Sequence, residues 1–287
     1  MNGMCKCHDE DRNRDGNDSG LVDLDAQLLL YLVVDGPELA RAVLEGRGLL
    51  DNQDRGPGLG GGPGGATTAK YIARDSQGAI DVTMIEPQEK FITCFHSNLF
   101  LGDMRPYDSL IHAYKLDAYG VKHVRQMAAA IDRDKKEVRL ADGGKLAYDR
   151  LVVSPGIDIK FEAVPGYSEA AAEKMPHGYK PGPQTLLLKK QLDALDDGST
   201  IVMIAPPNPY RCPPGPYERV SVMAKVLKEK GHAKSKIIVL DANENIVSKG
   251  PLFRAAWDQL YKGMIDYRPN SEVKDVDAAN LAVNQTL

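Results

Sequence analysis

The sequence predicts an α/β protein with two βαβ units and parallel sheets, incomplete at both ends. Three observations predict this class: buried β-branched runs alternate with helical patterns, a glycine-dense loop precedes one helix, and a proline-rich loop precedes another. Strands that alternate with helices are typical of a parallel sheet covered by its crossover helices. A length of 287 residues allows one or two such domains.

Composition excludes several classes of function. Hydrophobic residues make up 43% of the chain and charged residues 26%, which is ordinary for a globular protein. A net charge of -4 argues against a nucleic-acid partner, because such proteins neutralise phosphates with excess cations. No apolar run approaches the roughly 18 residues of a membrane helix, and the polar N-terminus shows no export signal. We therefore expect no transmembrane segment.

Residues 1–56 differ from the rest of the chain and are expected to be disordered or unrelated to it. The first twenty are rich in Asp, Asn, Arg and Gly, which favours disorder. Cys5, Cys7 and His8 could suggest a metal site, but no second ligand pair follows at zinc-like spacing. We expect no metal site.

The first candidate site is the glycine loop, where Gly60, Gly62 and Gly65 fit the pattern G-x-G-x-x-G. In that pattern the glycines allow a tight turn, close approach to a pyrophosphate, and helix packing on the sheet. The helix that follows offers free N–H groups to phosphates. Glu86 ends the next strand, where a carboxylate accepts hydrogen bonds from ribose. The unit predicts a dinucleotide-binding, Rossmann-like domain over residues 57–160; the alternative is a flexible glycine linker.

One feature departs from this pattern, because no strand directly precedes the glycine loop. Either the apolar run LLLYLVV fills that position across a long loop, or the first strand is absent. Residues 108–119 predict a helix. Residues 121–156 predict strands with a Gly-Gly turn, ending in a buried strand and Gly156. That last strand could equally be any buried parallel strand with a turn.

The second unit is expected over residues 161–264 as another Rossmann-like domain. It has a helical pattern near 185–195, the strand IVMIA, a proline-rich loop, a helix and the strand KIIVLD. The loop lacks a glycine fingerprint and its prolines remove backbone donors, so NAD(P) binding is not expected there. Cys212 lies in this loop between Arg211 and a helix, which favours the thiolate. Cys94 could be a small core residue.

At this point the residues resemble the flavoprotein subunit of flavocytochrome c sulfide dehydrogenase, within the pyridine nucleotide-disulfide oxidoreductase-like proteins that have two dinucleotide folds. The resemblance extends from about Gly60 to about Asn270, and it is specific because the run C-P-P-G-P-Y-E-R is not a generic flavoprotein motif. The matching segments are GGGPGGATTAKYI, VTMIEP, FITCFHSN, YDRLVVSPGI, GYSEAAAEKMPH and APPNPYRCPPGPYERVSVMAKVLK.

The resemblance implies FAD as cofactor, with Cys94 joined to the flavin by a thioether and Gly156 beside it. Cys212 matches one of two redox-active cysteines that oxidise sulfide beside the flavin. The electrons then pass to a c-type cytochrome subunit, and family members are periplasmic. The implied activity is that of an FAD-dependent sulfide dehydrogenase.

The chain departs from the family after Cys212, because no cysteine follows it. Residues 265–287 match a truncated return to the FAD domain, which suggests a fragment. Two alternatives stay open. One is a sulfide:quinone oxidoreductase-like enzyme, and the other is an inactive FAD-binding fragment.

Overall fold

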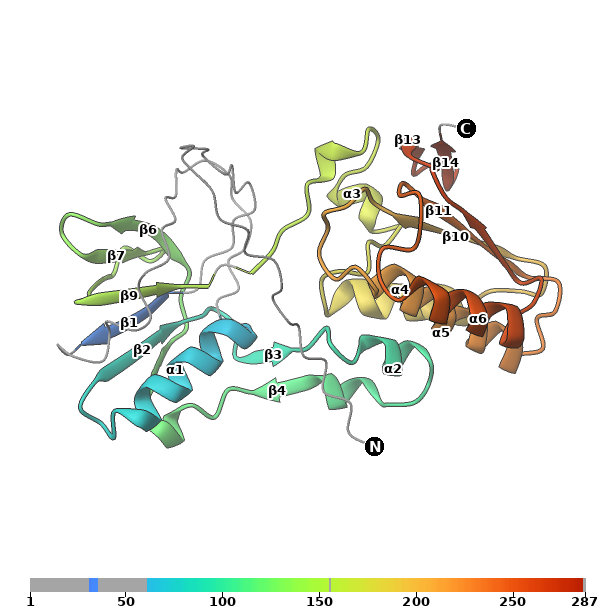
Figure 1. The fold of residues 1–287 in the computed structure, drawn as a ribbon. Helices are drawn as coiled ribbons and strands as arrows, with labels where there is room; N and C mark the ends of the chain where they lie inside the picture. Colours follow the sequence, from blue (N-terminus) through green and yellow to red (C-terminus); the bar gives the residue numbers. More distant parts are fainter. Residues whose placement is uncertain (1–30, 36–60, 155, 286–287) are drawn as a thin grey trace, which may run out of the picture.

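The computed structural model describes residues 31–35, 61–154 and 156–285. Figure 1 shows two lobes, with the N-terminal lobe drawn in blue to green and the C-terminal lobe in yellow to red. Gly60, the cysteines at 5 and 7 and most of the N-terminal segment lie outside the described residues.

A four-stranded sheet organises the N-terminal lobe, in the order β5, β2, β1, β9. Its strands are β1 (Tyr31–Asp35), β2 (Asp81–Ile85), β5 (Lys122–Val124) and β9 (Arg150–Val153). β2 and β5 are parallel, whereas β1 runs antiparallel to β2 and to β9. The apolar run before the glycine loop therefore does fill the first-strand position, but in the reverse direction. The α/β class with parallel strands is confirmed, and β1 is the exception.

Helix α1 (Pro63–Asp75) begins directly after the glycine loop. Proline suits its first position, because the missing N–H has no partner within the helix there. Ala69 and Ala73 are buried against Val82 and Met84 of β2. These small side chains let the helix lie close to the sheet, which keeps its N-terminus near the C-terminal end of β2.

A two-stranded ribbon extends from this lobe beneath the other lobe (Figure 1). It pairs β3 (Lys90–Ile92) with β4 (Ile111–Ala113) and leads to the short helix α2 (Ser97–Leu101). The helix predicted over residues 108–119 is wrong, because pairing with β3 makes its centre a strand. Only short 3-10 turns flank that strand, η2 (Tyr107–Leu110) and η3 (Asp117–Tyr119).

The strands predicted around the Gly-Gly turn are confirmed as a three-stranded antiparallel sheet. They are β6 (Ala128–Asp132), β7 (Glu137–Leu140) and β8 (Lys145–Ala147). Val138 and Leu140 of this sheet pack on Ile85, the last residue of β2. This contact covers the strand end that leads to Glu86.

The C-terminal lobe is a parallel three-stranded sheet in the order β10, β11, β12, with helices against it. Its main elements are β10 (Thr200–Ala205), β11 (Lys236–Asp241), β12 (Ile265–Arg268), α4 (Pro183–Asp193), α5 (Gly215–Glu229) and α6 (Gly250–Leu260). Smaller elements are η4 (Phe161–Ala163), α3 (Glu169–Ala172) and the hairpin of β13 (Val273–Asp277) and β14 (Ala282–Gln285). β12 continues the sheet past residue 264, where the second domain was expected to end.

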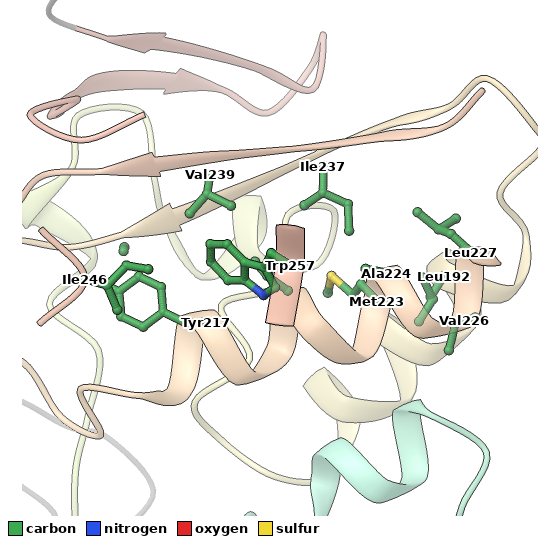
Figure 2. Packing of buried hydrophobic residues seen from close by; sticks show 12 residues of the cluster. Leu192, Tyr217, Met223, Ala224, Val226, Leu227, Ile237, Val239, Ile246 and Trp257 are labelled. Atoms are coloured by element: carbon green, nitrogen blue, oxygen red, sulfur yellow. The ribbon is translucent and has the colours of Figure 1, made fainter. Parts of the chain in front are cut away.

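The core of this lobe lies between α5, α6 and the sheet. Figure 2 shows Met223 and Leu227 of α5 facing Ile237 and Val239 of β11, with Trp257 of α6 beside them. Leu227, Ile237 and Val239 are completely buried. Burying a large aliphatic side chain stabilises a fold by about 1.5–3 kcal/mol. This packing fixes the axis of α5, whose first turn follows the loop of Cys212.

Candidate active site

The glycine loop forms an open turn at the start of α1. Gly62 is the N-cap residue and gives the helix no side-chain cap. A Cβ on Gly62 would meet nothing within 4 Å, whereas a Cβ on Gly61 would lie 2.0 Å from Tyr114 Oη. Gly65 is buried against the sheet. The uncapped helix start and the free space at Gly62 fit a phosphate group, which needs backbone donors and close approach.

Glu86 lies at this loop, as the sequence predicts from its position after β2. The side chain is fully buried. Oε2 accepts a hydrogen bond from Gly61 N–H, and Oε1 accepts one from Gln88 N–H at 2.8 Å. His123 Nε2 lies 2.8 Å from the carbonyl oxygen of Glu86. The backbone N–H groups of Gly61 and Gln88 therefore hold the Glu86 carboxylate, which the sequence predicts to bind ribose, against the glycine loop.

The exit of β9 approaches the same helix start. Ser154 Oγ would lie 3.6 Å from a Cβ at Gly64. Gly156 has a φ of 78°, a left-handed backbone that favours glycine. The structure thus brings the β9 exit and the glycine loop side by side, the arrangement expected of a return strand next to a dinucleotide.

Two cysteines from different lobes form the second part of the site. Cys94 follows β3, and Cys212 lies between β10 and α5; both are free and exposed. Cys212 has a φ of 59°, which is uncommon for a residue with a side chain. Its carbonyl accepts a hydrogen bond from Gly215 N–H at 2.8 Å, and a Cβ on Gly215 would lie 3.3 Å from Cys212 Sγ. This turn folds the thiol back over the start of α5.

The electrostatics connect the two thiols. Both cysteines are exposed at the surface, yet the protein around each sulfur desolvates it in part. This desolvation raises the pKa of Cys94, against the lowering effects of a backbone hydrogen bond, Arg211 and Arg219. Desolvation also raises the pKa of Cys212, and the charges of Glu218 and Cys94 add to it, against Gly215 N–H and Arg211. The net effect is a raised pKa, so the expectation that the surroundings of Cys212 favour its thiolate is wrong. Because each thiol lies near the same arginine, the two lobes place them in one neighbourhood.

Arg219 of α5 was not singled out from the sequence, although it ends the run C-P-P-G-P-Y-E-R. Its Nη2 donates to Ser97 Oγ at 3.0 Å, and Ser97 Oγ donates to the carbonyl of Cys94 at 2.8 Å. Burial lowers the pKa of Arg219, which still leaves a guanidinium cation at neutral pH. Arg219 thus connects the helix of one lobe to the cysteine loop of the other. Only the tertiary fold reveals this contact.

The proline-rich loop of Cys212 is tied to the end of β11. Asn243 Oδ1 accepts from Asn208 N–H at 2.9 Å, and Asn243 Nδ2 donates to Pro206 O at 2.9 Å. Within the loop, Tyr210 Oη donates to Pro213 O at 3.0 Å. These bonds on both sides of Cys212 hold its backbone in place.

Comparisons with known proteins identify the family. Residues 59–191 match the pyridine nucleotide-disulphide oxidoreductase family, and residues 185–287 match the central part of the sulfide dehydrogenase (flavocytochrome c) flavoprotein chain. The sulfide dehydrogenase (flavocytochrome c) flavoprotein chain of Chlorobaculum thiosulfatiphilum is 52% identical over 40 residues, which are 14% of this chain and 81% of that sequence. This chain belongs to the flavocytochrome c sulfide dehydrogenase flavoprotein family. The resemblance drawn from the sequence motifs is confirmed.

Two sulfide:quinone oxidoreductases are also similar to this flavoprotein. The mitochondrial enzyme of Mus musculus is 28% identical over 115 residues, 40% of this chain and 25% of that protein. The structure of the enzyme from Aquifex aeolicus aligns with a TM-score of 0.60 at 20% identity, over 78% of this chain and 54% of that one. At that identity the second likeness shows the fold alone. The chain spans a quarter of one relative and about half of the other.

In the C-terminal lobe of the flavoprotein, the acidic residue at the end of β11 is hydrogen-bonded to other side chains of the same lobe. In a nucleotide-binding unit, the acid at the end of the second strand binds ribose. Here Asp241 ends β11, is fully buried, and accepts from Tyr217 Oη at 2.6 Å and Tyr267 Oη at 2.9 Å. Asn243 Nδ2 donates to its other oxygen at 2.8 Å. This saturation agrees with the proline-rich loop in disfavouring a second nucleotide.

Among the described residues of the flavoprotein, no group of three or more His, Cys, Asp and Glu side chains is arranged to hold a metal ion. None of the helices in the described ranges is long and apolar enough to cross a membrane.

Proposed function

We propose that this chain is the FAD-binding, sulfide-oxidising part of a flavocytochrome c sulfide dehydrogenase. The observation that supports it best is the pair of exposed thiols, Cys94 and Cys212, which come from separate lobes into one electrostatic neighbourhood. In the proposed enzyme, a flavin that extends from the glycine loop would use one sulfur group from each lobe, Cys94 for attachment and Cys212 for the chemistry. The family is a flavoprotein family, which agrees with this role.

The residues that would hold FAD belong to the N-terminal lobe, which we assign to residues 57–160. Gly60, Gly62, Gly65 and the start of α1 would bind the pyrophosphate, and Glu86 the ribose. Gly156 would lie beside the cofactor. Cys94 would form the thioether to the flavin. Residues 161–264 would supply the sulfide site. Residues 265–287 would begin the segment by which the chain returns to the FAD domain.

When bound, FAD supplies an acceptor that takes two electrons and releases them singly. Cys212 would act in a disulfide with a second cysteine, which the family supplies and the sequence after Cys212 does not contain. Hydrosulfide would attack the Cys212 sulfur of that disulfide and form a persulfide bond, while the old S–S bond breaks and its electron pair leaves on the second sulfur. Bound FAD would be the acceptor of that electron pair, and a c-type cytochrome subunit in the periplasm would be the final acceptor.

A quinone acceptor is the second candidate, favoured by the likeness to the mitochondrial sulfide:quinone oxidoreductase of Mus musculus. Anaerobic assays with sulfide separate the two acceptors. Reduction of cytochrome c without reduction of a soluble quinone supports the first candidate, and the opposite result supports the second. Reduction of neither identifies an inactive FAD-binding fragment.

The absorbance spectrum of the acid-denatured protein tests the flavin assignment. We expect flavin absorbance to stay with the precipitated polypeptide, since a thioether survives acid. In Cys94→Ala the flavin should appear entirely in the supernatant, whereas in Cys212→Ala it should stay with the chain. Free flavin from the unaltered protein would contradict attachment at Cys94.

A further inference from the structure

The guanidinium of Arg219 has a hydrogen-bond donor that has no acceptor among the described residues. Its Nη2 is bonded to Ser97, but its Nη1 is buried and has no hydrogen-bond partner among the described residues. Leaving a buried guanidinium donor without a hydrogen bond is unfavourable, because the donor has lost its water without gaining a partner. The ion pairs found in the described part of the chain include none to Arg219, although the exposed Glu218 precedes it. A free donor on a buried cation is a position for an anion.

The hydroxyl of Tyr179 is a second unused donor in the same cluster. It is buried and, within the described ranges, lacks a hydrogen-bond partner. Burial raises its pKa to about 12, and Cys212 and Arg219 also act on it. The neighbouring Gly178 has a φ of 70°, and a Cβ there would lie 3.4 Å from Arg219 Nη1. The segment before α4 therefore lies directly on the guanidinium.

Both thiols lie within electrostatic range of the guanidinium. Burial lowers the pKa of Arg219, and the charges of Cys94, Tyr179 and Cys212 raise it. Arg211, next to Cys212, adds a second cation, and Glu218 is the carboxylate that acts on Cys212. An anion placed here would meet the buried Nη1 of a guanidinium and a buried hydroxyl, within electrostatic range of both thiols. Such a position suits a small monoanion that reacts with sulfur.

We propose that Arg219 Nη1 and Tyr179 Oη form an anion-binding site that holds hydrosulfide beside Cys212. Naming hydrosulfide as the occupant rests on the proposed function, while the anion site itself does not. Arg219 supplies a partly buried charge, which water screens less than an exposed one, and Tyr179 supplies a neutral donor. Neutral hydrogen sulfide would gain little from either group, so the site selects the ionised, nucleophilic form of sulfide.

The test compares two alkylating reagents at Cys212 in the full chain as purified, followed by mass spectrometry of the Cys212 peptide. Iodoacetate is an anion and iodoacetamide is its neutral analogue, so the ratio of their rates reports the local preference for an anion. We expect Arg219→Gln to lower this ratio about five- to tenfold, because steering by a nearby charge acts on the encounter with a charged reagent. Arg219→Lys should keep most of the ratio.

A matched control removes a cation from the far end of the same helix. Lys228→Gln should leave the ratio unchanged, since that side chain donates to Leu260 O, remote from the thiols. If Arg219 acts only on ionisation of the thiol, both reagents slow equally and the ratio stays constant, which overturns the proposal. If Arg219→Gln does not fold, the same rate ratio is measured in Tyr179→Phe, where we expect it to fall. A ratio in Tyr179→Phe equal to that of the unaltered chain would overturn the proposal.

The alkylation ratio requires neither flavin nor turnover. An inactive chain can therefore show the anion preference, and an active chain can lack it. An anion preference in an inactive chain would support the anion site and contradict the proposed function. Activity without an anion preference would support the proposed function and contradict the anion site.

Discussion

At the scale of single residues, ionisation of the Cys212 thiol is set by opposing groups. The thiolate is the nucleophile in sulfur exchange, so its pKa controls the rate. Burial and the Glu218 carboxylate raise this pKa, while Gly215 N–H and the Arg211 guanidinium lower it. The raised pKa keeps Cys212 protonated to a higher pH than an ordinary thiol.

Glu218→Gln tests this balance. Removing the carboxylate removes a charge that disfavours the thiolate, so the pKa of Cys212 should fall. The pH dependence of Cys212 alkylation by iodoacetamide should therefore shift to lower pH, with a higher rate at neutral pH. Glu229→Gln, an exposed carboxylate in the last turn of the same helix, should leave the profile in place. A shift to higher pH in Glu218→Gln would refute the assigned sign.

At the scale of elements, the loop of Cys212 depends on the end of β11. Asp241 accepts hydroxyl bonds from Tyr217 on α5 and Tyr267 on β12, and Asn243 bonds both to it and to the loop. One buried carboxylate thus fixes a helix, two strands and the loop. The acid that elsewhere binds a nucleotide serves here as a structural acceptor.

Asp241→Ala should destabilise the protein by about 3 kcal/mol or more, because a buried donor left without a partner costs roughly 1–3 kcal/mol and two hydroxyls lose theirs. Asp241→Asn keeps an acceptor oxygen and should lose less. Asp266→Ala removes an exposed carboxylate of β12 paired with Arg268 and should cost under about 1 kcal/mol. Urea unfolding measures all three. Equal losses in Asp241→Ala and Asp266→Ala would show that the network contributes little.

The elements nearest the chemistry follow from local pattern. Val82 and Met84 alternate with more exposed neighbours in β2, so the strand and the position of Glu86 after it were predictable. The glycine spacing located the start of α1. The pattern also located β10, α5 and β11, because each is a long run with a clear period.

Other features of the fold and of the site depend on tertiary contacts, which a local sequence pattern does not reveal. Ile111–Ala113 has a helical neighbourhood in sequence but pairs with β3, so tertiary pairing overrode local preference. The direction of β1 is not encoded in its five residues, four apolar side chains followed by Asp35. Arg219 and Tyr179 became candidates only when the fold placed their unused donors beside cysteines of both lobes.

At the scale of the whole molecule, the two lobes meet through the segment around α2. Arg219 bonds Ser97 there, Lys225 Nζ donates to Gly102 O at 3.2 Å, and Lys189 pairs with Asp103 at 2.8 Å. Figure 1 shows α2 beneath α4 and α5. These contacts hold the Cys94 loop of one lobe against the Cys212 loop of the other, and the proposed flavin site depends on that arrangement.

The most direct measurement is thiol bridging with dibromobimane, a short reagent that joins two nearby thiols, on full-length chain in which Cys94 has no flavin. We predict a bridged peptide pair containing Cys94 and Cys212, found by mass spectrometry and lost in Cys94→Ser. Single labelling of both thiols without a bridge, or bridges only to Cys5 or Cys7, would contradict a shared site between the lobes.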